Sequence, residues 1–485
     1  MFISLLFLSC LFAFVLPLFS RRVEAIGVLA LTGASALFLS ALALGVPALF
    51  VAPSVSPDGL WYLDPFAAIL VIIIGFVQWT ATMVSVPYLR TEVSHGAIGK
   101  KRVREYYALV TFFVLSMFAA VLGNNLGLMW VALEATTLAT TLLVSFYAKE
   151  ASLEAAWKYL LLCSVGISLG LLGVFLTAYA AATSGLTGVA GISFANLLSV
   201  AATLPPEVMR IAFVFILVGF GTKVGLVPMH AWLPDAHGRT PSPVSGLLSG
   251  VLLNVALFAL IRYKVLVDGA LGGSRWSDGL FLAFGALSFI VPAAFILVQK
   301  NYKRLLAYSS IEHMGFVVFS FGLGVPGMIV GTMHLIGHAL TKSMLFFAAG
   351  NTLLHFKTTK IANVKGVLQA LPITGGFFLA GILAILAVPP SPLFVSEFRL
   401  VGAALSAEPW YLAGMLLAGA VIFAGFIRLL MPMLFQRSSE QPASRERLNL
   451  SHAAMALHLV AIIAFGIFFL TPAGESFITN IIKSL

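Results

Sequence analysis

Long apolar stretches follow one another along almost the whole chain, separated by short polar connections. Each has the length that a helix needs to cross the roughly 30 Å hydrocarbon core of a bilayer, about 20 residues. The pattern predicts 14 transmembrane helices, at residues 2–20, 23–51, 63–87, 105–122, 125–147, 156–183, 208–227, 242–265, 278–299, 304–323, 326–354, 370–395, 409–433 and 450–472. The connections reach only about 25 residues, so we expect no separate soluble domain.

Composition supports the same fold class. Hydrophobic residues make up 60% of the 485 residues and charged residues 9%, whereas charged residues form about a quarter of an average soluble protein. One core could not hide so much apolar surface. We therefore expect an all-α polytopic membrane protein.

The positive charges predict the orientation. Of the 28 Lys and Arg, 18 fall on the side reached after the first span, 6 on the other side and 4 within spans. By the positive-inside rule the richer side, which includes the loop RTEVSHGAIGKKRVRE at 90–105, is cytoplasmic, and both termini face outward. Arg21 and Arg22 follow the first apolar run, so it reads as a retained span and not as a secretion signal. The net charge of +10 is largely this topology signal and needs no nucleic acid.

The sequence has neither a cysteine cluster for a metal centre nor a phosphate-binding loop. Cys10 and Cys163 are the only cysteines and both fall in predicted spans, which excludes an iron–sulfur or nickel site held by thiolates of this chain. The run GFGTKVG at 219–225 has the spacing GxGxxxG inside a span, so it does not form the strand-to-helix turn of a phosphate loop.

Ionisable residues within the apolar runs are the candidate functional residues. Each costs about 2.5–3.5 kcal/mol at mid-bilayer, which makes each a functional hypothesis. They are Glu134, Lys158, Lys223, Glu312, His313, His334, His338, Lys342 and Glu397. Alternatives remain open for several of them. Lys158 lies near a helix start and could snorkel to the surface, and Glu397 could be interfacial. His334 and His338 taken singly could each be a neutral core histidine that bonds to a carbonyl of a neighbouring helix.

Three of these residues share one helix in MHLIGHALTKSMLFFAAG, residues 333–350. His334, His338 and Lys342 are four residues apart, so each step drifts only about 40° around the helix and rises about 6 Å. The three side chains therefore face one way and predict a hydrated proton relay. Metal binding by the two histidines is the rival interpretation, but the sequence offers neither HExxH nor a nearby third ligand, and we expect no metal.

Polar positions recur along the chain at nearly constant offsets. Glu312 lies 178 residues after Glu134, Lys342 lies 184 after Lys158, Glu397 lies 174 after Lys223, and Arg428 lies 174 after Asn254. The offset corresponds to five spans, an odd number, so the second copy enters the membrane from the opposite face. This pattern predicts an inverted repeat.

The repeat divides the chain into four segments. These are an N-terminal three-helix segment with the basic loop at 1–104, a first five-helix repeat at 105–265, a second at 278–433, and a C-terminal helix and tail at 434–485. Prolines break the seventh span after Lys223 and the twelfth before Glu397, so each repeat is expected to form a proton half-channel gated there. If Glu134 approaches Lys223, moving this partner away would release a proton from the lysine.

The motifs GTKVGLVPMHAWLPDAHGRTPSPVSGLLSGVLL, KRLLAYSSIEHMG and MHLIGHALTKSMLFFAAG resemble the antiporter-like membrane subunits of respiratory complex I, Mrp antiporters and membrane-bound [NiFe] hydrogenases. Within that family the chain looks most like the F subunit of hydrogenase-4. The resemblance implies that Lys223 is the gating lysine and that Glu134 is its charged partner. It also implies that His334, His338 and Lys342 form the central relay and that Glu397 is the terminal proton group. One position departs from the family: Asn254, near Ser249, stands where many relatives have lysine or histidine. Asn254 can bind water but cannot carry a proton, so the link between half-channels is expected to use Glu312 and His313.

The resemblance implies a proton-translocating subunit of a hydrogenase-4-like complex in a prokaryotic inner membrane, not catalytic by itself. Other antiporter-like subunits, a peripheral redox arm and membrane lipids are the expected partners. The NiFe centre and iron–sulfur clusters are expected in those partners, with no cofactor in this chain. A subunit of NADH-quinone oxidoreductase and an Mrp-type cation/proton antiporter subunit remain the alternatives.

Overall fold

The computed structural model describes residues 2–436 and 446–485, and it consists almost entirely of helices, which confirms the all-α polytopic fold class. Ten helices in this part of the chain are long and apolar enough to cross a membrane. The count of 14 spans and the four-segment division stay predictions. Residues 437–445 of the expected C-terminal segment lie outside the described residues.

The elements follow the chain in two halves. The first half contains α1 (Phe2–Val15), η1 (Leu16–Phe19), α2 (Val23–Ala48), β1 (Ser54–Val55), β2 (Tyr62–Leu63), α3 (Pro65–Ser94), α4 (Lys100–Leu122), α5 (Leu126–Val144), α6 (Glu150–Thr183), η2 (Ala190–Ile192), α7 (Phe194–Ser199), η3 (Ala201–Thr203), α8 (Pro206–Val224), η4 (Met229–Trp232), α9 (Leu233–Arg239), α10 (Ser242–Leu247), the π-helical turn η5 (Leu248–Leu252) and α11 (Leu253–Leu271). The second half contains α12 (Arg275–Leu297), α13 (Tyr302–Phe321), α14 (Gly324–Phe356), η6 (Ile361–Asn363), α15 (Val367–Ala370), α16 (Pro372–Ile385), α17 (Pro392–Ala407), α18 (Pro409–Phe435), α19 (Leu450–Phe469) and α20 (Pro472–Ile482).

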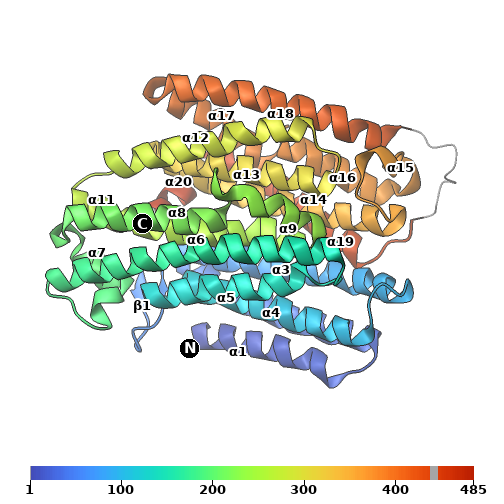
Figure 1. The fold of residues 1–485 in the computed structure, drawn as a ribbon, viewed down its shortest axis with the longest axis horizontal. Coiled ribbons are helices and arrows are strands. Elements are labelled where there is room, and N and C mark those ends of the chain that lie inside the picture. The colour runs from blue at the N-terminus through green and yellow to red at the C-terminus, as the bar shows by residue number, and fades with distance from the viewer. Residues whose placement is uncertain (1, 437–445) are drawn as a thin grey trace.

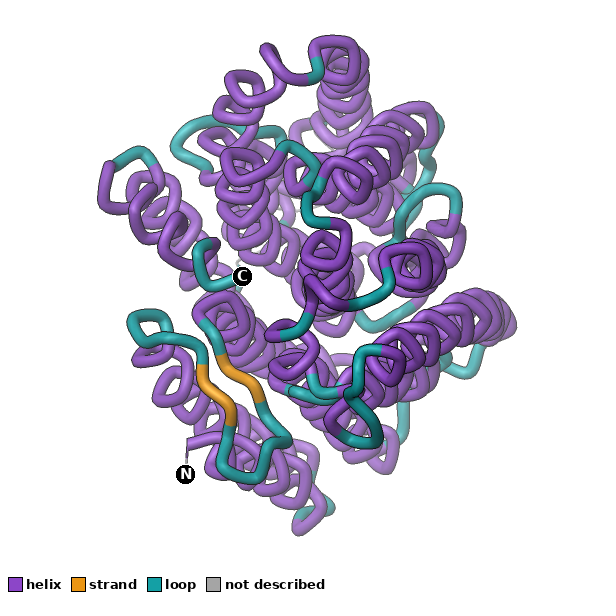
Figure 2. The backbone as a smooth tube through the Cα atoms, turned by 90° about the vertical axis from the view of Figure 1, so that its left-hand side faces the viewer, coloured by secondary structure: helices purple, strands orange, loops and turns teal. Residues whose placement is uncertain are grey.

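The long helices lie side by side along one direction (Figure 1), and the view turned by 90° shows many of them end on (Figure 2). The antiparallel pair β1–β2 is a short hairpin between α2 and α3, which the hydrophobic pattern did not predict. Helices suit a membrane chain because each helix satisfies its backbone hydrogen bonds internally where no water is present.

Helix α14 forms the centre of the bundle. It packs against α3, α10, α13, α16, α17 and α19, and residues 331–350 are all buried. At Gly337 an added Cβ would lie 2.8 Å from Cγ of Pro392, the first residue of α17. The absence of a side chain at this glycine lets α17 approach α14 where the two helices carry candidate residues.

Two helix breaks lie where the prolines predict them. Helix α8 ends at Val224, one residue after Lys223, and Gly225 follows with φ 85°. This left-handed conformation favours glycine, and an added Cβ there would meet Cδ1 of Leu233 at 2.5 Å. Helix α16 ends at Ile385 and α17 begins at Pro392, so Glu397 lies inside a new helix and not at the end of the preceding span.

A buried ion pair joins the hairpin region to α11. Arg262 donates to Oδ2 of Asp64 at 2.5 Å, and its guanidinium lies 4.5 to 5.1 Å from the ring centroids of Phe258, Phe194 and Tyr62. Asp64 also caps α3 by accepting from the backbone N–H of Ala67. The contacts fix the N-terminal end of α3 against α11.

Glu446 attaches the start of α16 to α19. Its carboxylate accepts from the backbone N–H groups of Ile373 and Thr374 at 2.8 and 3.1 Å and lies 2.9 Å from His452 Nε2. Burial raises the pKa of Glu446, but the hydrogen bonds from His452 and Thr374 outweigh burial and lower the pKa below its ordinary value. The resulting stabilisation is present above the carboxyl's unfolded-state pKa and is lost as pH falls through the folded-state value.

Candidate functional site: two buried lysine networks

Lys223 is held by hydroxyl groups from two other helices. Its fully buried ammonium donates to Thr137 Oγ1 on α5 at 2.8 Å and to the Tyr159 hydroxyl on α6 at 2.7 Å. The Tyr159 hydroxyl also lies 2.6 Å from Thr140 Oγ1, one turn beyond Thr137. The lysine therefore sits at the helix break with neutral oxygens as its partners.

Glu134 reaches this lysine through a hydroxyl. Thr137 Oγ1 donates to Glu134 Oε2 at 3.1 Å, and Ser164 Oγ donates to Oε1 at 2.9 Å. Among the described residues no direct ion pair joins Glu134 to Lys223. The structure thus brings the two residues into one network, with the Thr137 hydroxyl between the two charged partners that the resemblance implies.

Lys158 lies apart from Lys223. Its side chain is 50% exposed, pairs with Glu154 one turn earlier at 2.5 Å, and lies 3.7 Å from Asp235. Asp235 in turn is 3.3 Å from Arg304. This placement agrees with the snorkelling alternative for Lys158, because the ammonium ends among surface charges and not in the buried network.

The second network runs between α13 and α14. Lys342 donates to the Leu306 carbonyl at 2.8 Å and to Ser309 Oγ, both on α13. One turn along α14, the ring centroid of His338 lies 5.5 Å from that of His313. His313 Nδ1 and His334 Nε2 are 2.9 Å apart. The predicted line on α14 is therefore completed by residues from α13, with His313 between the two α14 histidines.

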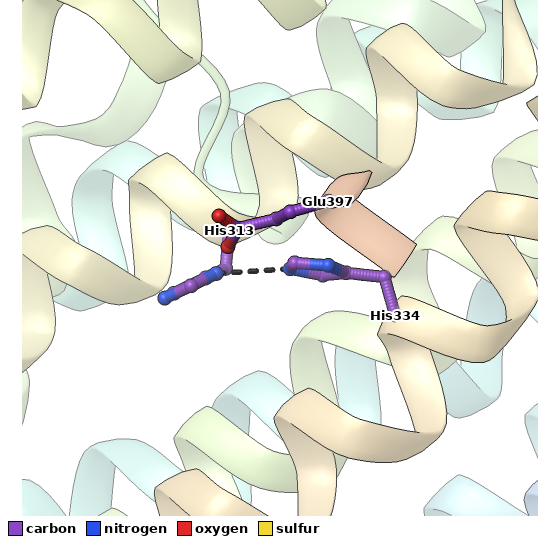
Figure 3. A group of neighbouring side chains, drawn as sticks. All are labelled: His313, His334 and Glu397. Atoms are coloured by element: carbon purple, nitrogen blue, oxygen red, sulfur yellow. Dashed lines mark hydrogen bonds between the residues drawn. The ribbon is translucent and has the colours of Figure 1, made fainter. Parts of the chain in front are cut away.

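The carboxylate of Glu397 on α17 lies beside His313 and His334, at the end of this line that is farther from Lys342. One ligand atom each from His313, His334 and Glu397 lies within 4.8 Å of the others (Figure 3). Ser396, next to Glu397, places its Oγ 2.9 Å from His334 Nδ1 and helps to orient that ring. Two imidazoles and a carboxylate can relay a proton, and they are also a zinc-type donor set. The third ligand that the sequence did not reveal is thus Glu397, which lies 63 positions after His334 and 84 after His313 along the chain.

Both carboxylates of this half line one cavity. Glu312 and Glu397 contribute to a cavity of about 410 Å³ between α12, α13, α16, α17 and α18. Phe398, Leu416 and Phe423 also line it, and their exposed fractions of 71%, 55% and 47% show that it reaches the molecular surface. Glu312 Oε2 lies 3.9 Å from His313 Nε2. The cavity therefore brings Glu312 and Glu397 to one partly open face of the chain.

Ser249 lies in the π-helical turn η5, and Asn254 lies two residues after this turn, in the first turn of α11. Asn254 Nδ2 donates to the Gly250 carbonyl at 2.9 Å, while its buried Oδ1 has no partner among the described residues. Ser249 Oγ is 2.7 Å from Ser310 Oγ on α13. A π-turn is frequent at functional sites, and here it brings the first half of the chain to the helix that carries Glu312 and His313.

Further buried polar residues belong with these networks. His338 and His237 are fully buried and all four of their ring nitrogens lack a partner among the described residues. His237 stacks on Phe346 with centroids 5.3 Å apart, and buried Lys303 donates to the Thr240 carbonyl at 2.6 Å. The sequence analysis did not select His237 or Lys303, because their burial depends on the packing of α9 against α13 and α14.

The chain is similar to known membrane subunits. Residues 123–423 match the family model NADH:quinone oxidoreductase/Mrp antiporter, TM. Over 426 residues the chain is 37% identical to the hydrogenase-4 component F homolog of Methylacidiphilum infernorum, an alignment that covers 87% of this chain and 88% of that protein.

The likeness extends to solved structures. A chain of membrane-bound sulfane sulfur reductase, an archaeal respiratory membrane complex, has a TM-score of 0.85 at 25% identity over 100% of this chain and 98% of its own. A chain of the Mrp complex from a Dietzia species has a TM-score of 0.84 at 18% identity over 99% and 96%, which concerns the fold alone.

Proposed function

This chain belongs to the NADH:quinone oxidoreductase/Mrp antiporter transmembrane family, and from that premise we propose that it translocates protons as a subunit of a hydrogenase-4-like complex. The similarity to the hydrogenase-4 component F homolog favours this complex over a NADH-quinone oxidoreductase. The redox reaction belongs to partner subunits, and this chain couples to it by moving protons.

One observation carries the proposal: the buried line from Lys342 through His338, His313 and His334 to Glu397. It joins three helices, α13, α14 and α17, through the core of the bundle. Imidazole accepts a proton on one nitrogen and releases one from the other, so adjacent rings pass a proton without moving far. Ionisable side chains inside a membrane protein cost free energy when they lack partners, and proton transport is a function that requires them there.

The roles follow from the contacts. Lys223 exchanges its proton with the hydroxyls of Thr137 and Tyr159, and Glu134 acts on it through Thr137. In the second half Lys342 passes its proton toward the histidines, and Glu397 releases it into the cavity shared with Glu312. Between the halves, the Ser249–Ser310 contact places η5 beside the helix of Glu312 and His313.

The arrangement in the membrane is part of the proposal. The helix breaks after Lys223 and before Glu397 support two inverted half-channels, and the 18 positive charges on one side support a plasma-membrane protein with both termini outside. A periplasmic reporter enzyme fused after Leu485 should be active. Activity of a cytoplasmic reporter at that point instead would reverse the orientation.

Redox centres are assigned to partner subunits. The two cysteines of the chain, Cys10 and Cys163, lie buried on α1 and α6, so they do not form the thiolate cluster that an iron–sulfur or nickel centre uses. The partners proposed are further antiporter-like membrane subunits and a peripheral redox arm.

The test of the proposal is purification of the tagged full chain from its own membranes, with mass spectrometry of co-purifying subunits and proton transport after reconstitution. Co-purification of a nickel hydrogenase large subunit and acidification of vesicles on turnover are expected. Co-purification of only small antiporter subunits, with sodium-dependent transport and no redox protein, would assign the chain to cation/proton antiport.

A further inference from the structure

A basic pocket lies at the helix ends opposite the hairpin β1–β2. It has a volume of about 570 Å³ and lies between α9, the α12–α13 connection, η6 and the end of α18. Six cationic side chains line it and one acidic side chain, Asp235. The cations are Arg239, Lys300, Arg304, Lys360, Lys365 and Arg428. None of them belongs to the two lysine networks.

Most of this positive charge has no acidic partner within the part of the chain that the structure describes. Asp235 pairs with Arg304 at 3.3 Å and with Lys158 at 3.7 Å. The other five cations have no carboxylate within 4.0 Å among the described residues, and the buried Nε of Arg304 has no partner there. Like charges gathered around one pocket repel each other, so an anion bound there would be stabilised by all of them.

The same pocket has an apolar wall. Leu429, Pro432 and Met433 on α18 line it together with Ile361 and Val364. Arg428 stands on α18 one turn before Pro432, and the hydrophobic pattern had placed it within a span. The pocket wall on α18 therefore changes from charged at Arg428 to apolar at Pro432 and Met433. An amphipathic ligand, which has a charged end and an apolar end, would match this change.

We propose that this pocket binds an anionic phospholipid, with the phosphate headgroup among the cations and an acyl chain along Leu429, Pro432 and Met433. Basic pockets between transmembrane helices on the cytoplasmic side suit such headgroups, because that leaflet is rich in anionic lipid. A free phosphate would use the cations alone and would leave the apolar wall without a role. The site holds a lipid where the connections after α9, α12 and α14 meet.

The test measures lipid retention by the full chain. Native mass spectrometry would follow the chain released from micelles doped with phosphatidylglycerol or, separately, with phosphatidylcholine. The triple variant Arg239→Gln, Lys360→Gln, Lys365→Gln should bind phosphatidylglycerol roughly 100-fold more weakly than the wild type, because each basic residue contributes severalfold. These three residues are exposed and unpaired with described carboxylates, so the variant is expected to keep its fold, which its elution volume checks.

A matched control removes the same charge elsewhere. Arg90→Gln, Lys100→Gln, Arg104→Gln changes the other basic loop and should bind phosphatidylglycerol as the wild type does. Equal retention of the two lipids by the wild type, or equal loss in the two triple variants, would overturn the proposal. Displacement of the lipid by millimolar inorganic phosphate would assign the pocket to a free anion. If the pocket triple variant bound lipid as the wild type does but failed to assemble into the complex, the pocket would be assigned to a protein partner. Displacement by phosphate and this loss of assembly would each contradict the lipid site.

Discussion

The two halves of the molecule hold their buried lysines in different ways. Lys223 is surrounded by hydroxyls, and its carboxylate, Glu134, stands one side chain away. Lys342 is held by a backbone carbonyl and one serine, and it is followed by three histidines and a carboxylate. The first half thus surrounds one lysine with neutral partners, whereas the second places several ionisable groups in a line, which under the proposed function carries a proton over a distance.

The largest effect is expected at the residue that joins the histidine line. His313→Leu removes the ring between His334 and His338, and proton transport should fall roughly 100-fold, the lower range for loss of a positioned proton-transfer group. The measurement is dye-reported acidification in vesicles containing the assembled complex. The control is His355→Leu, an exposed histidine on the same α14, which should retain the wild-type rate. Equal transport rates in His313→Leu and His355→Leu would show that the histidine line of the second half does not carry the proton.

A smaller effect is expected in the hydroxyl network. Thr137→Val keeps the volume of the side chain but disconnects Glu134 from Lys223, and transport should slow roughly tenfold, since hydrogen bonds to charged groups are worth about 1.5–3 kcal/mol. Thr141→Val, one turn further along α5, is the matched control. A wild-type rate in Thr137→Val would show that Glu134 acts without this hydroxyl.

The link between the halves is tested at Glu312. Glu312→Gln keeps the shape of the side chain but cannot exchange a proton. Transport should slow about fivefold, and not stop, because the Ser249–Ser310 contact still joins the two halves beside His313. Unchanged transport would remove Glu312 from the link and leave Ser249, Ser310 and His313 as the connection. The rate is compared at equal amounts of assembled complex.

The smallest effect is expected at Lys158. Its half-exposed ammonium pairs with Glu154, and exposed ion pairs contribute only about 0–1 kcal/mol. Lys158→Gln should therefore change transport less than about twofold. A loss as large as that of His313→Leu would return Lys158 to the proton relay and contradict the comparison of the two halves.

The sequence revealed those features that depend on one helix at a time. Proline positions predicted both helix breaks, and four-residue spacing predicted the common face of His334, His338 and Lys342. Spacing could not reveal that Thr137 stands between Glu134 and Lys223, because three helices determine which side chain intervenes. It also could not reveal the approach of Glu397 to His313 and His334, which depends on α17 packing at Gly337.

Packing also determines where Lys158 and Glu397 lie, for the same reason. Lys158 is eight residues inside α6, yet Glu154 on its own helix and Asp235 from α9 draw its ammonium to the surface. Glu397, which the pattern placed near the end of a span, is partly buried beside His313 and His334 because the chain restarts as α17 at Pro392.

Proton transport by the complex containing Lys342→Met tests the central claim most directly. Methionine fills a similar volume and carries no proton, so the complex should assemble while vesicle acidification falls to the passive leak. Lys100→Met, at the start of α4, is the control for losing one positive charge. Acidification at the wild-type rate in a fully assembled Lys342→Met complex would contradict a proton path through this buried line.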